Sequence, residues 1–315
     1  MIETREQRTT CHRSVLTADD AHRILVDTWR PADGVAVRAV IQIFHGLGEH
    51  PARYERFANY CNERGFAVVA HAHRGHGEKC NAAELGHYAD DDGWDKVIGD
   101  ARLVQQEIIR QFAERPLILL GHSMGSYIAQ AFMMQHAENV QALILSASTY
   151  APRLQLRAGH LLAAFEVWRS GPRAKSALLN RMSFGGFNKR FAPNRTEFDW
   201  LSRDENEVDR YVADALCGAP SSNKLWHDLT RGLLEITARK SISGIPEKLP
   251  VLITGGEQDP VGGARGLGRL TNAYRASGHT DIALKVYEGG RHEMFNETNR
   301  DAFSADLLDW IEATI

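Results

Sequence analysis

The chain has 315 residues, of which 43% are hydrophobic and 24% are charged, and its formal net charge is −3. These values are typical of a soluble globular protein with one large α/β domain or about two ordinary ones. The charge and the lack of a basic motif interleaved with aromatic residues argue against nucleic acid as a partner. No apolar stretch is long enough to span a bilayer, and the polar first residues carry no secretory signal. We therefore expect a cytoplasmic protein, and its four widely spaced cysteines are expected to be free thiols.

Short apolar runs alternate with longer amphipathic runs between residues 35 and 145. The pattern predicts strands and helices in turn, at 37–44, 57–64, 66–70, 94–112, 117–120, 126–136 and 140–145. Alternating strands and helices form a mostly parallel sheet flanked by helices, with right-handed crossovers.

The alternation breaks between residues 149 and 239. This segment has helical stretches separated by turns that contain glycine and proline, and no convincing strand; the clearest stretches are 161–168, 174–182 and 224–238. Two further strands are predicted at 249–254 and 282–287, followed by a last helix at 301–313. We therefore expect one α/β core with an inserted helical cap. The core would comprise 1–148 and 240–315, and the cap 149–239.

Ser123 lies where a predicted buried strand gives way to a predicted apolar helix. Gly121 and Gly125 flank it at two positions on either side, in the order Gly121-His122-Ser123-Met124-Gly125. Glycines at these positions allow a sharp turn that pushes the serine hydroxyl outward, as in a nucleophile elbow. An ordinary turn between two elements is the alternative.

A nucleophilic serine needs a histidine to take its proton and an acid to orient that histidine. Asp259 and His292 each follow one of the last two predicted strands, so we expect both at the sheet edge that carries Ser123. Glu257 is the rival carboxylate, and we favour Asp259 on its position in the loop. The chain order of serine, aspartate and histidine is that of the α/β-hydrolase fold.

Acyl transfer also needs two N–H donors for the oxyanion of the tetrahedral intermediate. The loop that begins with His45 and Gly46 follows the first predicted strand, where the hydrolase fold keeps its oxyanion loop. We expect the backbone N–H groups of Leu47 and Met124 to be the two donors. His45 either orients this loop through a hydrogen bond or simply packs.

Several segments, in order from about residue 45 to residue 293, together carry a resemblance to a known family. They are His45-Gly46-Leu47-Gly48-Glu49-His50 with Arg53-Tyr54, His73-Arg74-Gly75-His76-Gly77, the elbow at Ser123, Asp259, and Gly290-Arg291-His292-Glu293. The chain resembles the monoglyceride lipase and lysophospholipase branch of the α/β-hydrolases, a branch similar to the serine aminopeptidases of family S33, in a bacterial form. It departs from the family pattern at Ala72 and Lys79, and neither position belongs to the triad.

The resemblance implies a serine hydrolase that cleaves carboxylic esters of lipids with one acyl chain, without metal or organic cofactor. A short-chain carboxylesterase and a thioesterase remain open alternatives, because the same serine chemistry serves them. A non-catalytic protein of the same fold that binds a small ligand is the alternative of another class. The complete triad and oxyanion loop argue against it.

Two other motifs suggest metals. His71, His73 and His76 have the spacing of a zinc site, but the aspartate that usually precedes the last histidine is replaced by Gly75. The acidic run 90–95 misses the EF-hand positions, and it is better interpreted as the N-terminus of a helix.

The predicted cap is basic and apolar at once. Between residues 153 and 195 it has nine Lys or Arg residues and one acid, Glu166. This composition suits a lid that rests on an anionic membrane or lipid surface and admits an acyl chain. The alternative is that these charges are solvated or pair with acids between residues 197 and 214.

Overall fold

The computed structural model describes residues 11–78, 80 and 83–315. Lys79 and the polar first ten residues, both discussed above, lie outside this part. The described chain forms one eight-stranded sheet in the order β1-β2-β4-β3-β5-β6-β7-β8. Its strands are β1 (Cys11–Thr17), β2 (Arg23–Trp29), β3 (Ala39–Phe44), β4 (Phe66–His71), β5 (Leu117–His122), β6 (Val140–Ser146), β7 (Val251–Gly256) and β8 (Ile282–Tyr287).

Strands β3 to β8 run parallel to one another, and β2 pairs antiparallel with both β1 and β4. The predicted fold class, a mostly parallel sheet flanked by helices, is therefore confirmed. The hairpin of β1 and β2 was not predicted from the sequence. Strand β1 lies at the edge with most of its side chains exposed, so it lacks the apolar run by which a buried strand is recognised.

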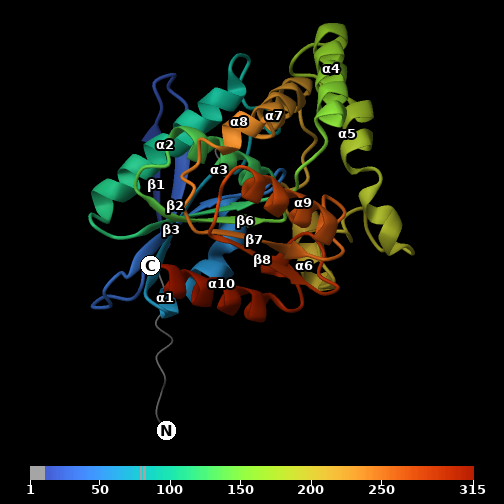
Figure 1. Ribbon diagram of the computed structural model, residues 1–315. Coiled ribbons are helices and arrows are strands. Elements are labelled where there is room, and N and C mark those ends of the chain that lie inside the picture. Colours follow the sequence, from blue (N-terminus) through green and yellow to red (C-terminus); the bar gives the residue numbers. More distant parts are fainter. Residues whose placement is uncertain (1–10, 79, 81–82) are drawn as a thin grey trace.

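Helices cover both faces of the sheet (Figure 1). On one face, α1 (Glu55–Glu63) and α10 (Arg300–Thr314) bury Phe57 and Phe303 in a common core. On the other face lie α2 (Gly93–Gln111), α3 (Met124–Gln135) and α9 (Gly263–Ala276). Helix α9 was missed because three of its residues are glycines, which are poor helix formers.

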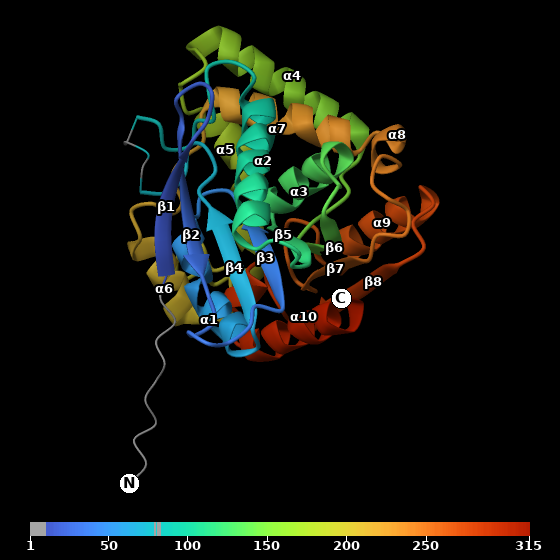
Figure 2. The same cartoon turned by 90° about the vertical axis from the view of Figure 1, so that its left-hand side faces the viewer.

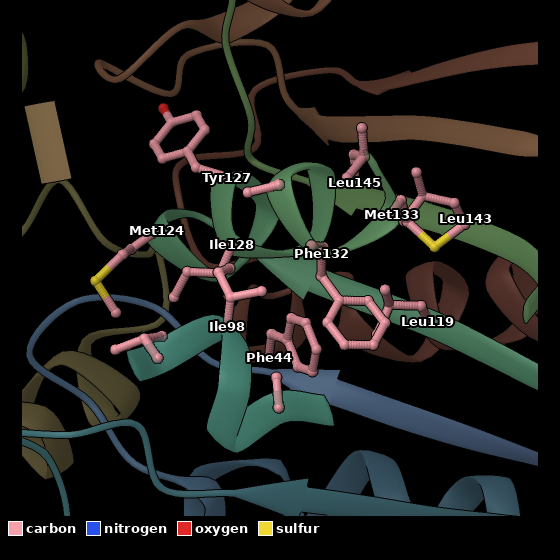
Figure 3. Packing of buried hydrophobic residues seen from close by; sticks show 14 of the residues in the cluster. Phe44, Ile98, Leu119, Met124, Tyr127, Ile128, Phe132, Met133, Leu143 and Leu145 are labelled. Carbon is pink, nitrogen blue, oxygen red and sulfur yellow. The ribbon is translucent and has the colours of Figure 1, made fainter. Parts of the chain in front are cut away.

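Helix α3 lies against the centre of the sheet and is buried over most of its length. Figure 3 shows Ile128 and Phe132 of this helix among Phe44 and Leu119, which come from the strands beneath. The rings of Phe44 and Phe132 meet edge to face with centroids 5.7 Å apart. This packing fixes the helix whose first turn follows Ser123.

The chain between β6 and β7 contains α4 (Arg153–Ser170), α5 (Ala177–Phe184), α6 (Glu205–Ala213), α7 (Asn223–Ile236) and the short α8 (Arg239–Ile242). Helix α7 packs on α2 and α3, and α4 packs on α7. Figure 2 shows α4 as the outermost helix of this stack. Within the described residues, no helix is both long and apolar enough to cross a membrane.

Candidate active site

Ser123 occupies a strained turn between β5 and α3. Its backbone lies at φ 52° and ψ −120°, a conformation that non-glycine residues rarely adopt. A Cβ atom added to Gly121 would lie 2.5 Å from the Gly125 carbonyl oxygen, and one added to Gly125 would lie 2.0 Å from that of Phe44. Only glycine fits at these two positions, so the spacing seen in the sequence has a steric cause.

The structure brings Ser123, His292 and Asp259 together in one hydrogen-bonded chain. The Nε2 atom of His292 lies 2.9 Å from Ser123 Oγ, and its Nδ1 atom lies 2.9 Å from Asp259 Oδ1. His292 and Asp259 are buried, whereas Ser123 is partly accessible. The rival Glu257 is exposed and accepts a hydrogen bond from the Gly289 N–H instead.

The charge around His292 suits proton transfer from a serine. Burial by itself lowers the pKa of His292, but the charge and hydrogen bond of Asp259, together with Glu293 and Glu49, outweigh it and raise that pKa above its ordinary value. For the neighbouring His122, burial outweighs the charges of Glu293 and Asp259 and lowers its pKa to about 3. Of these two histidines, only His292 has a pKa above its ordinary value, which suits a base that takes a proton.

The predicted oxyanion loop lies beside the nucleophile. A Cβ atom added to Gly46 would be 3.3 Å from the Cβ of Ser123. The N–H of Met124 is the first of α3 and has no acceptor within the helix. Neither it nor the N–H of Leu47 has an acceptor among the described residues. Both predicted donors are thus free to bind an oxygen of a substrate.

His45 orients the oxyanion loop through two hydrogen bonds. Its Nε2 accepts the N–H of His73 at 3.0 Å, so the ring proton is on Nδ1, which donates to the Gly46 carbonyl at 2.8 Å. Burial lowers the pKa of His45 well below its ordinary value and keeps this ring neutral. Of the two roles considered for His45 from the sequence, the structure favours the orienting one.

A buried ion-pair network joins the oxyanion loop to the His292 loop, and sequence reasoning did not find it. Arg53 forms two hydrogen bonds with Glu293 at 2.5 and 2.7 Å and a third with Glu49 at 3.1 Å. Glu49 in turn accepts the Gly46 N–H and the Tyr54 hydroxyl. Burial alone would raise the pKa of Glu293, but Arg53 lowers it, whereas for Glu49 burial dominates and raises the pKa.

The helical segment between β6 and β7 roofs the site directly. The Trp200 ring lies 5.0 Å from the His292 ring, and the Trp200 carbonyl accepts the His292 N–H. Leu201 accepts the next N–H, that of Glu293, at 2.8 Å. Around Trp200 lies a cluster of apolar side chains, which also includes Phe184, Phe187, Phe191, Phe198 and Val261. The site therefore has an apolar wall next to His292, the proposed general base.

The two metal motifs considered in the sequence have other roles. His71 and His73 are buried with their rings against Phe44, and within the described residues they do not converge with His76 as metal ligands. The acidic run precedes α2, whose N-cap is Asp92. Its other members pair with basic side chains: Asp90 with Arg173, Asp91 with Lys96, and Asp95 with Arg231.

The chain is similar to known hydrolases in sequence and in fold. A model of the serine aminopeptidase S33 family matches residues 35–299. The chain is 27% identical over 292 residues to a monoacylglycerol lipase of Mycolicibacterium smegmatis, covering 92% of each protein. It is 26% identical over 292 residues to the monoglyceride lipase of Mus musculus, covering 88% of this chain and 82% of that one. Its fold is similar to that of a thermostable carboxyl esterase from Bacillus coagulans solved with glycerol, with a TM-score of 0.89, 23% identity, and 98% and 99% of the two chains covered.

Proposed function

Because the chain belongs to the serine aminopeptidase S33 family of α/β-hydrolases, in its monoglyceride lipase branch, we propose that it hydrolyses esters of single-acyl-chain lipids. Monoacylglycerols are the first expected substrates and lysophospholipids the second. The continuous chain of hydrogen bonds from Ser123 through His292 to Asp259 carries this proposal. This chain of hydrogen bonds supports Ser123 as the nucleophile, His292 as the base and Asp259 as the carboxylate that orients it.

The proposed reaction proceeds through an acyl-enzyme. Ser123 Oγ attacks the ester carbonyl while His292 Nε2 takes its proton, and Asp259 stabilises the resulting imidazolium. The N–H groups of Leu47 and Met124 bind the oxyanion. His292 then protonates the leaving alcohol, and it later activates the water that frees the fatty acid. None of these steps uses a metal or an organic cofactor, so chelators should leave turnover intact.

The apolar cluster around Trp200 supports an acyl chain as the group bound next to His292. Trp200 contacts His292, and the cluster packed around it extends this apolar surface, which a site for a small polar alcohol would not need. The names of the similar proteins, monoacylglycerol lipase and monoglyceride lipase, support the same substrate class. We infer that residues 149–239 act as a lid over this acyl site.

The outer face of α4 supports contact of this lid with a lipid surface. Leu154, Leu161, Phe165 and Trp168 follow one another at intervals of seven, four and three residues, which places them on one helix face. All four are exposed, Leu154 by 80% and Trp168 by 81%, because α4 turns its opposite face to α7. An exposed apolar stripe of this kind fits the acyl and headgroup boundary of a membrane.

The charges near α4 favour an anionic surface. Arg157, Lys175, Arg181, Lys189 and Arg190 are exposed and form no salt bridge within the part of the chain that the structure describes. The acids between residues 197 and 214 pair with only one of the nine basic residues, Arg195. We therefore expect the protein to bind vesicles that contain anionic lipid at low salt more strongly than neutral vesicles. Equal binding to both would remove the electrostatic part of this proposal.

The activity is tested with Ser123→Ala and a substrate panel. The variant should fold normally, as judged by circular dichroism, and lose turnover of every ester. The panel compares kcat/KM for monoacylglycerols, lysophospholipids, short synthetic esters and acyl thioesters. We expect the highest value for a monoacylglycerol. A preference for short esters or thioesters would make the enzyme a general carboxylesterase or a thioesterase. Wild-type protein that turns over none of these substrates would favour the ligand-binding alternative.

A further inference from the structure

Three metal-binding side chains meet outside the triad, where the oxyanion loop contacts the helical segment. His50 ends the oxyanion loop, and Asp214 and Cys217 follow α6. One donor atom of each side chain lies within 4.8 Å of the others. His50 Nε2 is 2.8 Å from Asp214 Oδ2, and Cys217 also hydrogen-bonds to Asp214. Within the described residues, this is the one group of three or more such side chains that converges in this way.

We propose that His50, Asp214 and Cys217 form a zinc site that ties the helical segment to the oxyanion loop. Imidazole, carboxylate and thiolate are ligands that Zn²⁺ accepts together, whereas Mg²⁺ and Ca²⁺ prefer oxygen alone. Ligands of tetrahedral zinc lie about 3.3–3.8 Å apart, so the donor atoms here need to move by only about 1 Å. A water molecule would be the fourth ligand.

The charge balance of the site suits a divalent cation. Asp214 and the Cys217 thiolate together carry two negative charges, which Zn²⁺ neutralises, and the thiol proton is released to solvent on binding. Burial raises the pKa of the Cys217 thiol by more than Arg53 lowers it, so the thiol keeps its proton until an ion displaces it. His50 is buried and Asp214 is only partly exposed, so the ligands are largely shielded from competing water.

The surrounding backbone holds the three ligands together independently of any ion. The Gly218 N–H and the Tyr211 hydroxyl both donate to the Gly48 carbonyl, each at 2.9 Å. Asp214 Oδ1 accepts the Leu216 N–H at 2.9 Å, which fixes the orientation of that carboxylate. The oxyanion loop and the segment after α6 are therefore already held together. Binding of an ion would need little further ordering of the chain.

The consequence of zinc binding is a stabilised contact between α6 and the oxyanion loop. An ion bound only by the folded protein shifts the folding equilibrium by mass action. At zinc concentrations well above the Kd, we expect the Tm of the full chain to rise by about 2 °C or more. This rise does not depend on the identity of the substrate, so it is separable from the proposed esterase activity.

The test measures Zn²⁺ binding by calorimetry, Co²⁺ binding by absorption, and Tm with and without a chelator. The full chain should bind one ion at this site, give a thiolate-to-cobalt charge-transfer band and show the Tm rise. Cys217→Ser and Asp214→Asn should each lose the band and the rise. Cys11→Ser is the matched control, because Cys11 is an exposed thiol on β1, and it should keep both.

Two results would overturn the zinc site. One is a wild-type chain that gives no charge-transfer band at saturating Co²⁺. The other is a band or Tm rise that survives in both Cys217→Ser and Asp214→Asn, since the ion would then bind elsewhere. Circular dichroism of the chelator-treated variants checks that each is folded. If one variant does not fold, the presence or loss of the band in the other, folded variant decides the question.

Discussion

The sheet edge that carries Ser123 and the outer face of α4 both depart from the usual distribution of side chains, in opposite directions. At the edge, Asp259 and Glu293 are buried and Arg53 is partly buried, and each has a close partner. On α4, Leu161 and Trp168 are apolar and exposed. Burying polar groups costs free energy unless partners offset it, and contiguous exposed apolar patches commonly mark interaction sites. This difference is the basis for our proposals of catalysis at the first region and contact with lipid at the second.

The largest expected effect concerns the carboxylate at the sheet edge. Asp259→Asn should keep the fold but lower kcat by about 10⁴-fold, because an amide cannot hold His292 in the required tautomer or stabilise its charged form. Glu257→Gln is the matched control, since Glu257 is exposed in the same loop, and should change kcat little. Steady-state kinetics on the best ester measures kcat for both variants. A larger loss in Glu257→Gln would reverse the assignment of the acid.

The second prediction tests whether the protein loses stability when the ion-pair network of Arg53, Glu49 and Glu293 is broken. Arg53→Met leaves Glu49 and Glu293 buried without their cation, and we expect the free energy of unfolding to fall by about 3–5 kcal/mol. Urea unfolding followed by circular dichroism measures this. Arg110→Met removes an arginine from an exposed pair with Glu107 and should have little effect. Similar losses in both variants would mean that burial is not what makes the network important.

The third prediction breaks the exposed apolar face of α4. Trp168→Ser should weaken binding to anionic vesicles by about tenfold, because the indole is the largest apolar side chain on that face. The free energy of unfolding of this variant should equal that of the wild type, since the Trp168 ring is already exposed. Vesicle co-sedimentation gives the affinity, and hydrolysis of a short water-soluble ester is the control for an intact triad. Unchanged vesicle binding would assign another role to this face.

The smallest effect is a shift in pH dependence. Protonated His292 cannot take the Ser123 proton, so kcat/KM should fall as the pH drops through the pKa of His292 in the free enzyme. Because Asp259, Glu293 and Glu49 raise this pKa, the midpoint of the acid limb should lie above the ordinary value of 6.5. A pH profile of kcat/KM from pH 5 to 9 measures it. A midpoint below about 6 would show that burial outweighs the carboxylates.

The two regions also differ in how far the sequence predicts them. The strand before Ser123, the glycines on either side of this serine and the apolar helix after it form a local pattern. The nucleophile elbow could therefore be predicted from the sequence. Asp259 and His292 were found because each follows a strand, and parallel strands bring their carboxyl ends to one edge. The bond between Arg53 and Glu293 joins residues 240 positions apart and leaves no local pattern. Only the folded chain reveals it.

The orientation of α4 was not predictable from its sequence. The stretch around Leu162 and Phe165 is apolar on most sides, so no single face stands out as the buried one. In the structure the helix buries Glu166, which pairs with Arg169, and exposes Trp168. The basic composition of the segment was visible in the sequence, whereas the direction of its apolar face depends on packing against α7.

The central claim, that Ser123 is the nucleophile of the buried triad, is tested most directly by labelling with a fluorophosphonate. Peptide mass spectrometry should find one adduct per chain, on Ser123, formed as esterase activity is lost. The Ser123→Ala variant should carry no adduct and show no turnover. An adduct on another serine, such as Ser126 in the next turn, or full activity after complete labelling of Ser123, would contradict the account.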